Sequence, residues 1–92
     1  MDVKSAVKIA TSYVLDLFKD EDVSNVGLEE VEFDPAESVW VVTIGFSRPW
    51  DYPKNALASF TGETRPSRSY KVITIMDNSE QVVSIKNRAP DV

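Results

Sequence analysis

The chain has 92 residues and a formal net charge of −5, and it contains neither cysteine nor histidine. Without cysteine there can be no disulfide, no thiolate nucleophile and no Cys-ligated zinc. Without histidine the chain lacks the commonest general base, the commonest transition-metal ligand and the usual pH switch near neutrality. Its 42% hydrophobic and 27% charged residues are typical of a globular protein, and the length predicts a single domain over residues 1–92.

The charge is unevenly distributed along the chain. Residues 1–46 carry 3 basic and 10 acidic side chains, a sum of −7, whereas residues 47–92 carry 7 basic and 5 acidic ones, a sum of +2. Nonspecific binding to phosphate backbones needs clustered Lys and Arg, so no nucleic-acid partner is predicted. No apolar run approaches the ~20 residues that span a bilayer, and no signal-peptide pattern is seen, so we predict no membrane contact and a cytoplasmic location.

The first element in chain order is an amphipathic helix over residues 3–19. Its apolar side chains recur at spacings of three and four, which is the period of a helix with one buried side. Asp2 is placed to cap the first turn, and Lys19 suits the last turn. The predicted apolar stripe consists of Val3, Ala6, Val7, Ala10, Tyr13, Val14, Leu17 and Phe18.

Two strands are predicted next, over residues 28–34 and 38–48. At ~3.3 Å per residue the second strand would reach ~36 Å, whereas a helix of this length reaches only ~25 Å at 1.5 Å per residue. The sheet should therefore curl around the helix, and Gly45 is the expected site of a bend or bulge. One face of the second strand is formed by Trp40, Val42, Ile44 and Phe46.

The second half of the chain is predicted as a long loop, a hairpin and a tail. Residues 49–66 contain three prolines and one glycine, which exclude a continuous strand. Strands are expected at 68–76 and 81–87, followed by a loose tail at 89–92. The predicted fold class is α+β: an N-terminal helix packed on a curled four-stranded antiparallel sheet, in the order α-β-β-β-β.

Two segments resemble the PepSY-type or cystatin-like family of small αβββ domains. One is the Ala-rich opening, Ala6-x-x-x-Ala10-x-x-Tyr13. The other is the closing hairpin over residues 70–85, a strand followed by a short acidic turn and a valine-rich return strand. The resemblance implies a cystatin-like fold and a non-catalytic role in binding or inhibiting a partner protein.

A calcium site is the first candidate for metal chemistry. Asp20, Asp22 and Ser24 match the first three ligand positions of an EF-hand loop. However, Asn25 stands where the loop requires glycine, and Val31 stands where it requires a bidentate glutamate. No metal site is therefore predicted.

Paired carboxylates and activated nucleophiles are the remaining possible signs of catalysis. Glu30, Glu32 and Asp34 share one face of a strand, where water solvates them and nothing raises a pKa. An acidic row of this kind also protects an edge strand or offers a docking face to a basic partner. Because no histidine is present to activate a serine, we predict no catalytic residue, no cofactor and no enzyme activity.

The loop after the second strand holds the candidate binding residues. Trp, Tyr and Arg dominate the hot spots of protein interfaces, and nearby prolines reduce the ordering cost of binding. The alternative is that Trp50 and Phe60 fold back and plug the open end of the sheet. The candidate binding residues are Arg48, Trp50, Tyr52, Phe60 and Arg65.

One helix can cover only one face of the sheet. We expect Val39 and Val41, with Ile73 and Ile75 or their neighbours, on the uncovered face, where they could form a homodimer surface. The leading function is a non-enzymatic module that binds a protein or peptide, as an inhibitor or immunity-like factor. The alternative is a small-molecule carrier or cofactorless enzyme with a helix–sheet cavity, which would be lined by Tyr13, Trp40 and Tyr70.

Overall fold

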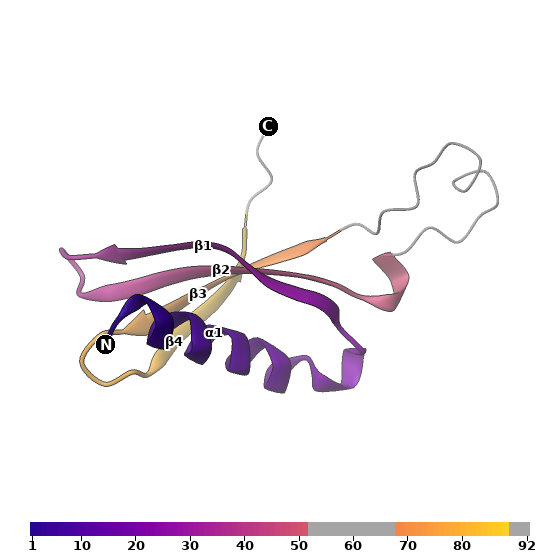
Figure 1. Cartoon of the computed structure of the whole chain (residues 1–92), viewed down its shortest axis with the longest axis horizontal. Helices are drawn as coiled ribbons and strands as arrows, with labels where there is room; N and C mark the ends of the chain where they lie inside the picture. The colour runs from indigo at the N-terminus through magenta and orange to yellow at the C-terminus, as the bar shows by residue number, and fades with distance from the viewer. Residues whose placement is uncertain (52–67, 89–92) are drawn as a thin grey trace.

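The structure is a computed structural model that describes residues 1–51 and 68–88. The predicted tail at 89–92 and most of the predicted loop lie outside these residues. The strands form one antiparallel sheet in the order β1-β2-β3-β4, and the helix lies along one side of it (Figure 1). This confirms the predicted α+β class with a curled sheet. The elements are α1 (Val3–Leu17), β1 (Ser24–Asp34), β2 (Val39–Ser47), β3 (Ser69–Met76) and β4 (Val82–Asn87).

The ends of α1 are set by local hydrogen bonds. The side chain of Asp2 accepts a hydrogen bond from the Ser5 backbone N–H at 2.8 Å, which confirms the predicted N-cap. The α-helix ends at Leu17, two residues before the predicted end, and a 3-10 turn follows over Lys19–Glu21. Asp22 then adopts the left-handed conformation with φ 49°, which reverses the chain toward β1.

The buried side of α1 is narrower than the predicted stripe. Ala6, Ala10 and Val14 recur every four residues and are fully buried. These small side chains let α1 lie close to the sheet, mainly over β1 and β2. In contrast, Val3, Tyr13 and Leu17 remain 48%, 38% and 51% exposed, so their assignment to the buried stripe was wrong.

The core lies between α1 and one face of the sheet. The predicted inward face of β2 is confirmed, because Trp40, Val42, Ile44 and Phe46 are all buried. Ile73 and Ile75 pair with Val42 and Trp40, and directly opposite residues of antiparallel strands share a face. Ile73 and Ile75 therefore belong to the core, and their expected place on the uncovered face was wrong.

The alternate residues of the same strands lie on the face of the sheet that α1 does not cover, which we call the uncovered face. Val39 lies opposite Met76, and Val41 lies opposite Thr74. Val72, opposite Thr43, completes the central rows of this face. The pairing register therefore shows that Val72 and Met76, and not Ile73 and Ile75, lie on the uncovered face.

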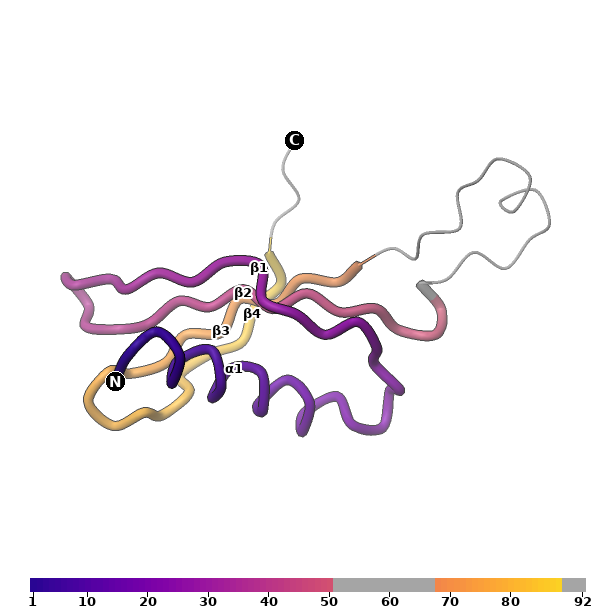
Figure 2. The backbone as a smooth tube through the Cα atoms, viewed as in Figure 1, coloured from indigo at the N-terminus to yellow at the C-terminus, as the bar shows by residue number. Residues whose placement is uncertain are grey.

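The sheet has bulges in β1 and, at Val83, in β4, and the prediction of a bulge at Gly45 was wrong. The β2–β3 register runs unbroken through Gly45, whereas the β1–β2 register shifts between Ser24 and Gly27 and again between Leu28 and Glu30. Each shift inserts an extra residue into β1, and the tube in Figure 2 shows this strand kinked midway along its length. β1 also begins at Ser24, four residues before the predicted start.

Gly45 serves a different purpose in the sheet. A Cβ atom at this position would lie 2.7 Å from Glu29 Oε1 and 2.7 Å from Arg68 Nη2. These two side chains form an ion pair at 3.1 Å that reaches from β1 toward the start of β3. The missing side chain of Gly45 leaves room for this ion pair on the uncovered face.

Candidate interaction site

Arg48 lies at the end of β2 that is close to the C-terminus of α1. Side chains alternate along a strand, so Arg48 continues the inward side of Phe46. The C-cap residue of α1, Phe18, packs on Phe46 with ring centroids 5.2 Å apart and an interplanar angle of 38°. A short 3-10 turn over Pro49–Asp51 follows and places Trp50 beside Arg48. We refer to Phe18, Glu21, Phe46, Arg48, Trp50 and Lys71 as the Arg48 cluster.

The Arg48 guanidinium is enclosed by aromatic rings. Its Cζ atom lies 5.1 Å from the ring centroid of Phe18, 5.3 Å from that of Phe46 and 5.4 Å from that of Trp50. Its Nη2 atom also lies 3.9 Å from a carboxylate oxygen of Glu21. The Arg48 side chain is only 18% exposed, and each cation–π contact of this kind contributes roughly 0.5–1 kcal/mol or more. The guanidinium therefore holds Trp50 against the end of the core.

Lys71 adds a second cation to the same cluster. It lies opposite Ile44 on the inward side of β3, and its Nζ atom is 5.7 Å from the Phe18 ring centroid. The same ammonium donates a hydrogen bond to Asn87 Oδ1. Burial, followed by the positive charge of Arg48, lowers the pKa of Lys71, while Glu21 acts in the opposite direction. Two cations thus share one aromatic ring at this end of the sheet.

Trp50 presents the largest exposed aromatic surface of the cluster. Its side chain is 55% exposed, so it does not plug the open end of the sheet. Tyr52, Phe60 and Arg65, the other predicted binding residues, lie outside the described residues. Of the five predicted residues the structure therefore describes Arg48 and Trp50, and it brings these two into contact.

Four members of the cluster were not among the predicted binding residues. Phe18 and Phe46 were assigned to apolar faces of the helix and the strand, and Glu21 and Lys71 were not considered as site residues. Lys71 could have been identified as unusual from the sequence, because alternate residues of a strand share a face and Lys71 therefore lies on the same face as the apolar Ile73 and Ile75. The pairing of Phe18 with Arg48 depends on the tertiary fold, and no local pattern indicates it.

The opposite end of the sheet is closed by a hydrogen bond. The indole Nε1 of Trp40 donates to Asp77 Oδ1 at 2.8 Å, and the N-terminal ammonium of Met1 lies 3.4 Å from the same oxygen. The pKa of Asp77 is lowered below its ordinary value, mainly by the hydrogen bond from Trp40 and to a smaller extent by the N-terminal ammonium. The Trp40 ring also packs on Phe33, with ring centroids 5.1 Å apart.

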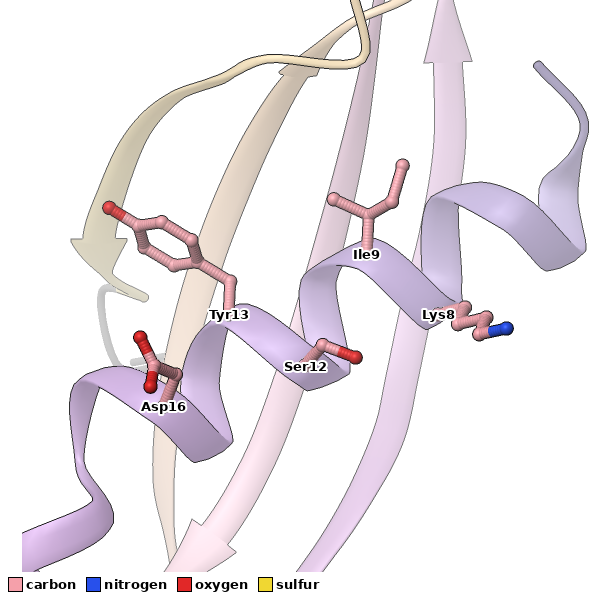
Figure 3. Close-up of a pocket in the computed structure, with 5 residues that line it drawn as sticks. All are labelled: Lys8, Ile9, Ser12, Tyr13 and Asp16. Atoms are coloured by element: carbon pink, nitrogen blue, oxygen red, sulfur yellow. The ribbon is translucent and has the colours of Figure 1, made fainter.

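The helix–sheet cavity predicted from sequence does not unite its three residues. Trp40 is buried in the core, and Tyr70 lies opposite Gly45 on the uncovered face. Tyr13 lines an open groove of about 410 Å³ on the flank of α1, where Figure 3 shows Tyr13 and Ile9 projecting on the same side. The groove is lined by Lys8, Ile9, Ser12, Tyr13 and Asp16.

Within residues 1–51 and 68–88, no three side chains of His, Cys, Asp or Glu gather as metal ligands would. No helix in the same ranges has the length and apolar character needed to cross a membrane.

Comparisons with known proteins give no relative for this chain. No protein-family model, no curated protein and no solved structure matches it. The resemblance to PepSY-type or cystatin-like domains therefore stays a prediction.

Proposed function

We propose that the protein is a non-enzymatic interaction module that binds a protein or peptide partner at the Arg48 cluster. The observation that carries this proposal is the exposed Trp50 ring, held on a guanidinium that is itself packed against the core. Tryptophan and arginine are the side chains most enriched at interface hot spots. An inhibitor or immunity-like factor would use such a surface to cover a partner's own site.

The cluster reduces the entropic cost of binding. An exposed tryptophan on a mobile chain loses rotamer freedom when a partner orders it, at roughly 0.5–1.5 kcal/mol per side chain. Here the ring contacts Arg48, and Arg48 is fixed between Phe18 and Phe46. The side chain is thus largely ordered before the partner arrives.

The surroundings of Trp50 favour a partner with an apolar anchor. The indole offers a broad apolar surface, and Arg48 and Lys71 place positive charge behind it. We expect the bound segment to insert an aliphatic or aromatic side chain against Trp50. Acidic residues next to that anchor would be favoured by the two cations.

Selection from a random 12-residue peptide library displayed on phage tests this proposal. We expect the peptides enriched on the wild-type protein to bind at least about tenfold more weakly to Trp50→Ala, because a hot-spot residue contributes 2 kcal/mol or more. Fluorescence anisotropy of synthetic peptides measures the affinities.

Tyr13→Ala is the matched control, because Tyr13 is also a partly exposed aromatic but lies on α1 away from the cluster. It should leave peptide affinity unchanged. Peptides that bind wild type and Trp50→Ala equally, or that lose affinity to Tyr13→Ala instead, would place the binding surface elsewhere.

The alternative function, a small-molecule carrier or cofactorless enzyme, has less support. Its predicted lining residues are spread over the core, the helix flank and the uncovered face. The groove beside Ile9 and Tyr13 is open and lined by helix residues. Saturation-transfer NMR with a fragment library would detect binding in this groove, and a signal there that Tyr13→Ala removes would favour the alternative.

The cytoplasmic location and the lack of a nucleic-acid partner also stay predictions. Fractionation of cells that produce the protein at its native level tests the location. Electrophoretic mobility shift with double- and single-stranded DNA and RNA tests the second prediction, for which we expect no shift at physiological salt.

A further inference from the structure

The uncovered face of the sheet carries side chains in rows that run across all four strands. Cross-strand partners define each row, because directly opposite residues lie on the same face. In one row Glu30 lies opposite Thr43, Thr43 opposite Val72, and Val72 opposite Lys86. The next row is Glu32, Val41, Thr74 and Ser84, and the row after it contains Asp34, Val39 and Met76.

All three rows have an acidic end on β1 and a mainly apolar middle, and the Glu30 row also has a basic end on β4. The acidic end is β1, with Glu30, Glu32 and Asp34, and the basic end is β4, with Lys86. The middle is formed by half-buried valine, threonine and methionine side chains of β2 and β3, except for Thr43, which is only 5% exposed. This side of the sheet therefore has a mainly apolar centre, an acidic edge on β1 and one lysine on the β4 edge.

The two charged ends are too far apart to pair within one chain. Four neighbouring strands spaced ~4.8 Å apart put Glu30 and Lys86 about 14 Å from each other. That separation exceeds the ~8 Å Debye length at physiological ionic strength. Both side chains are exposed. The Glu30 row is therefore complementary to a second Glu30 row that runs in the opposite direction.

We infer that a second copy of the chain packs face to face on this side of the sheet, about a two-fold axis parallel to the strands. Such an axis places β1 of one copy over β4 of the other and leaves each residue at the same position along the strand direction. Glu30 of each copy therefore lies opposite Lys86 of the other copy. The apolar bands of β2 and β3 then cover each other, as in aligned sheet packing. This inference is independent of the proposed function of the Arg48 cluster.

The size of the face predicts a weak dimer. Three rows about 7 Å apart and four strands about 4.8 Å apart span roughly 400 Å² on each copy. Two copies would bury on the order of 800 Å², which is below the ~1,200–2,000 Å² of stable complexes. We therefore expect a dissociation constant between about 10 μM and about 1 mM, and an affinity that falls as salt increases.

Charge reversal tests the two-fold directly, with sedimentation equilibrium of the purified chain from about 10 μM to about 1 mM. Glu30→Lys and Lys86→Glu should each weaken the dimer about tenfold or more, because symmetry makes each change affect two charge pairs. The double variant restores both pairs with inverted sign and should return to within about threefold of wild type.

Two variants control for net charge. Glu37→Lys in the β1–β2 turn and Lys4→Glu on α1 make the same charge changes away from the face, and both residues are exposed. They should leave dimerisation unchanged, and thermal unfolding confirms that every variant folds. The inference is overturned if the wild type is monomeric throughout the range, if both single reversals dimerise like wild type, or if the double variant is no better than the singles.

Discussion

The two ends of the sheet each place a tryptophan beside a charged residue, with opposite results. At one end Trp40 is 9% exposed, and its indole N–H donates to the Asp77 carboxylate at 2.8 Å. At the other end Trp50 is 55% exposed, and the face of its ring lies over the Arg48 guanidinium at 5.4 Å. The hydrogen bond from the indole N–H satisfies the polar group of Trp40, so its ring can be buried. The cation on the ring face of Trp50 orders that ring while much of its surface stays exposed to water.

If the proposed function is correct, this difference separates a structural end of the molecule from a binding end. The Trp40 end joins β2 to the β3–β4 turn, and its apolar ring completes the core. The Arg48 end fixes a large aromatic surface and leaves it available to a partner. The comparison predicts that substitutions at the first end change stability and substitutions at the second end change binding.

The largest expected effect comes from truncating the two tryptophans. Trp40→Ala should lower the free energy of unfolding by about 3–5 kcal/mol, because it removes a buried ring and leaves a cavity. Trp50→Ala should lower it by less than ~1 kcal/mol, because more than half of that side chain is already exposed. Urea denaturation followed by circular dichroism measures both values.

Trp40→Phe separates the ring from its hydrogen bond. It keeps much of the apolar volume and should be less damaging than Trp40→Ala, although Asp77 loses its indole donor. If Trp40→Ala and Trp50→Ala lower the free energy of unfolding equally, Trp40 is not more important for stability than Trp50, and the comparison of the two ends is wrong.

The second effect concerns the cation that holds Trp50. Arg48→Ala should lower the free energy of unfolding by about 1–2 kcal/mol, because the contacts with Phe18 and Phe46 are lost. It should also raise the pKa of Lys71 toward its usual value, since one of the causes of its lowering is the charge of Arg48. Heteronuclear NMR of the Lys71 side chain follows this titration.

Arg48→Met serves as the comparison variant, because methionine keeps an apolar stem on the two rings but carries no charge. It should retain part of the stability and give the same rise in the pKa of Lys71. A Lys71 pKa that stays unchanged in both variants would show that Arg48 does not act on it.

Much of the fold was predictable because the strongest patterns are local. The alternation of β2 identified Trp40, Val42, Ile44 and Phe46 as the inward face, and they form the centre of the core. The start of β1 was missed because Ser24, Asn25 and Gly27 are typical of a turn, and the bulged strand accommodates them. The face of Ile73 and Ile75 was misplaced because it depends on the register with β2.

The candidate site was predicted only in part for the same reason. Arg48 and Trp50 were found by composition, since a proline-flanked Trp and Arg pattern is typical of binding loops. Their environment comes from Phe18 and Lys71, which are distant in the sequence. Likewise, neither Trp40 nor Asp77 alone indicates that they form a hydrogen bond across 37 positions.

The smallest effect concerns the pH dependence of the Trp40 end. The pKa of Asp77 in the folded state lies below its ordinary value of 3.8, mainly because the charged form accepts the Trp40 hydrogen bond. Its contribution to stability is therefore present above pH 3.8 and is lost as the pH falls through the lower, folded pKa. Asp77→Asn should make the melting temperature less sensitive to acid between about pH 5 and about pH 2.

Asp16→Asn, at an exposed acid on α1, is the control for this experiment. It should follow the acid dependence of wild type. An Asp77→Asn variant with the wild-type acid dependence would mean that the Trp40–Asp77 contact is not coupled to folding.

The most direct test of the central claim is to map a selected peptide on the ¹⁵N-labelled protein by NMR. The claim predicts that the largest amide shift changes surround Phe18, Phe46 and Arg48, with the Trp50 indole N–H among them. It also predicts that the Trp40 indole N–H and the β3–β4 turn stay unperturbed. Shift changes centred on Trp40 and Asp77, or on the groove beside Ile9 and Tyr13, would contradict it.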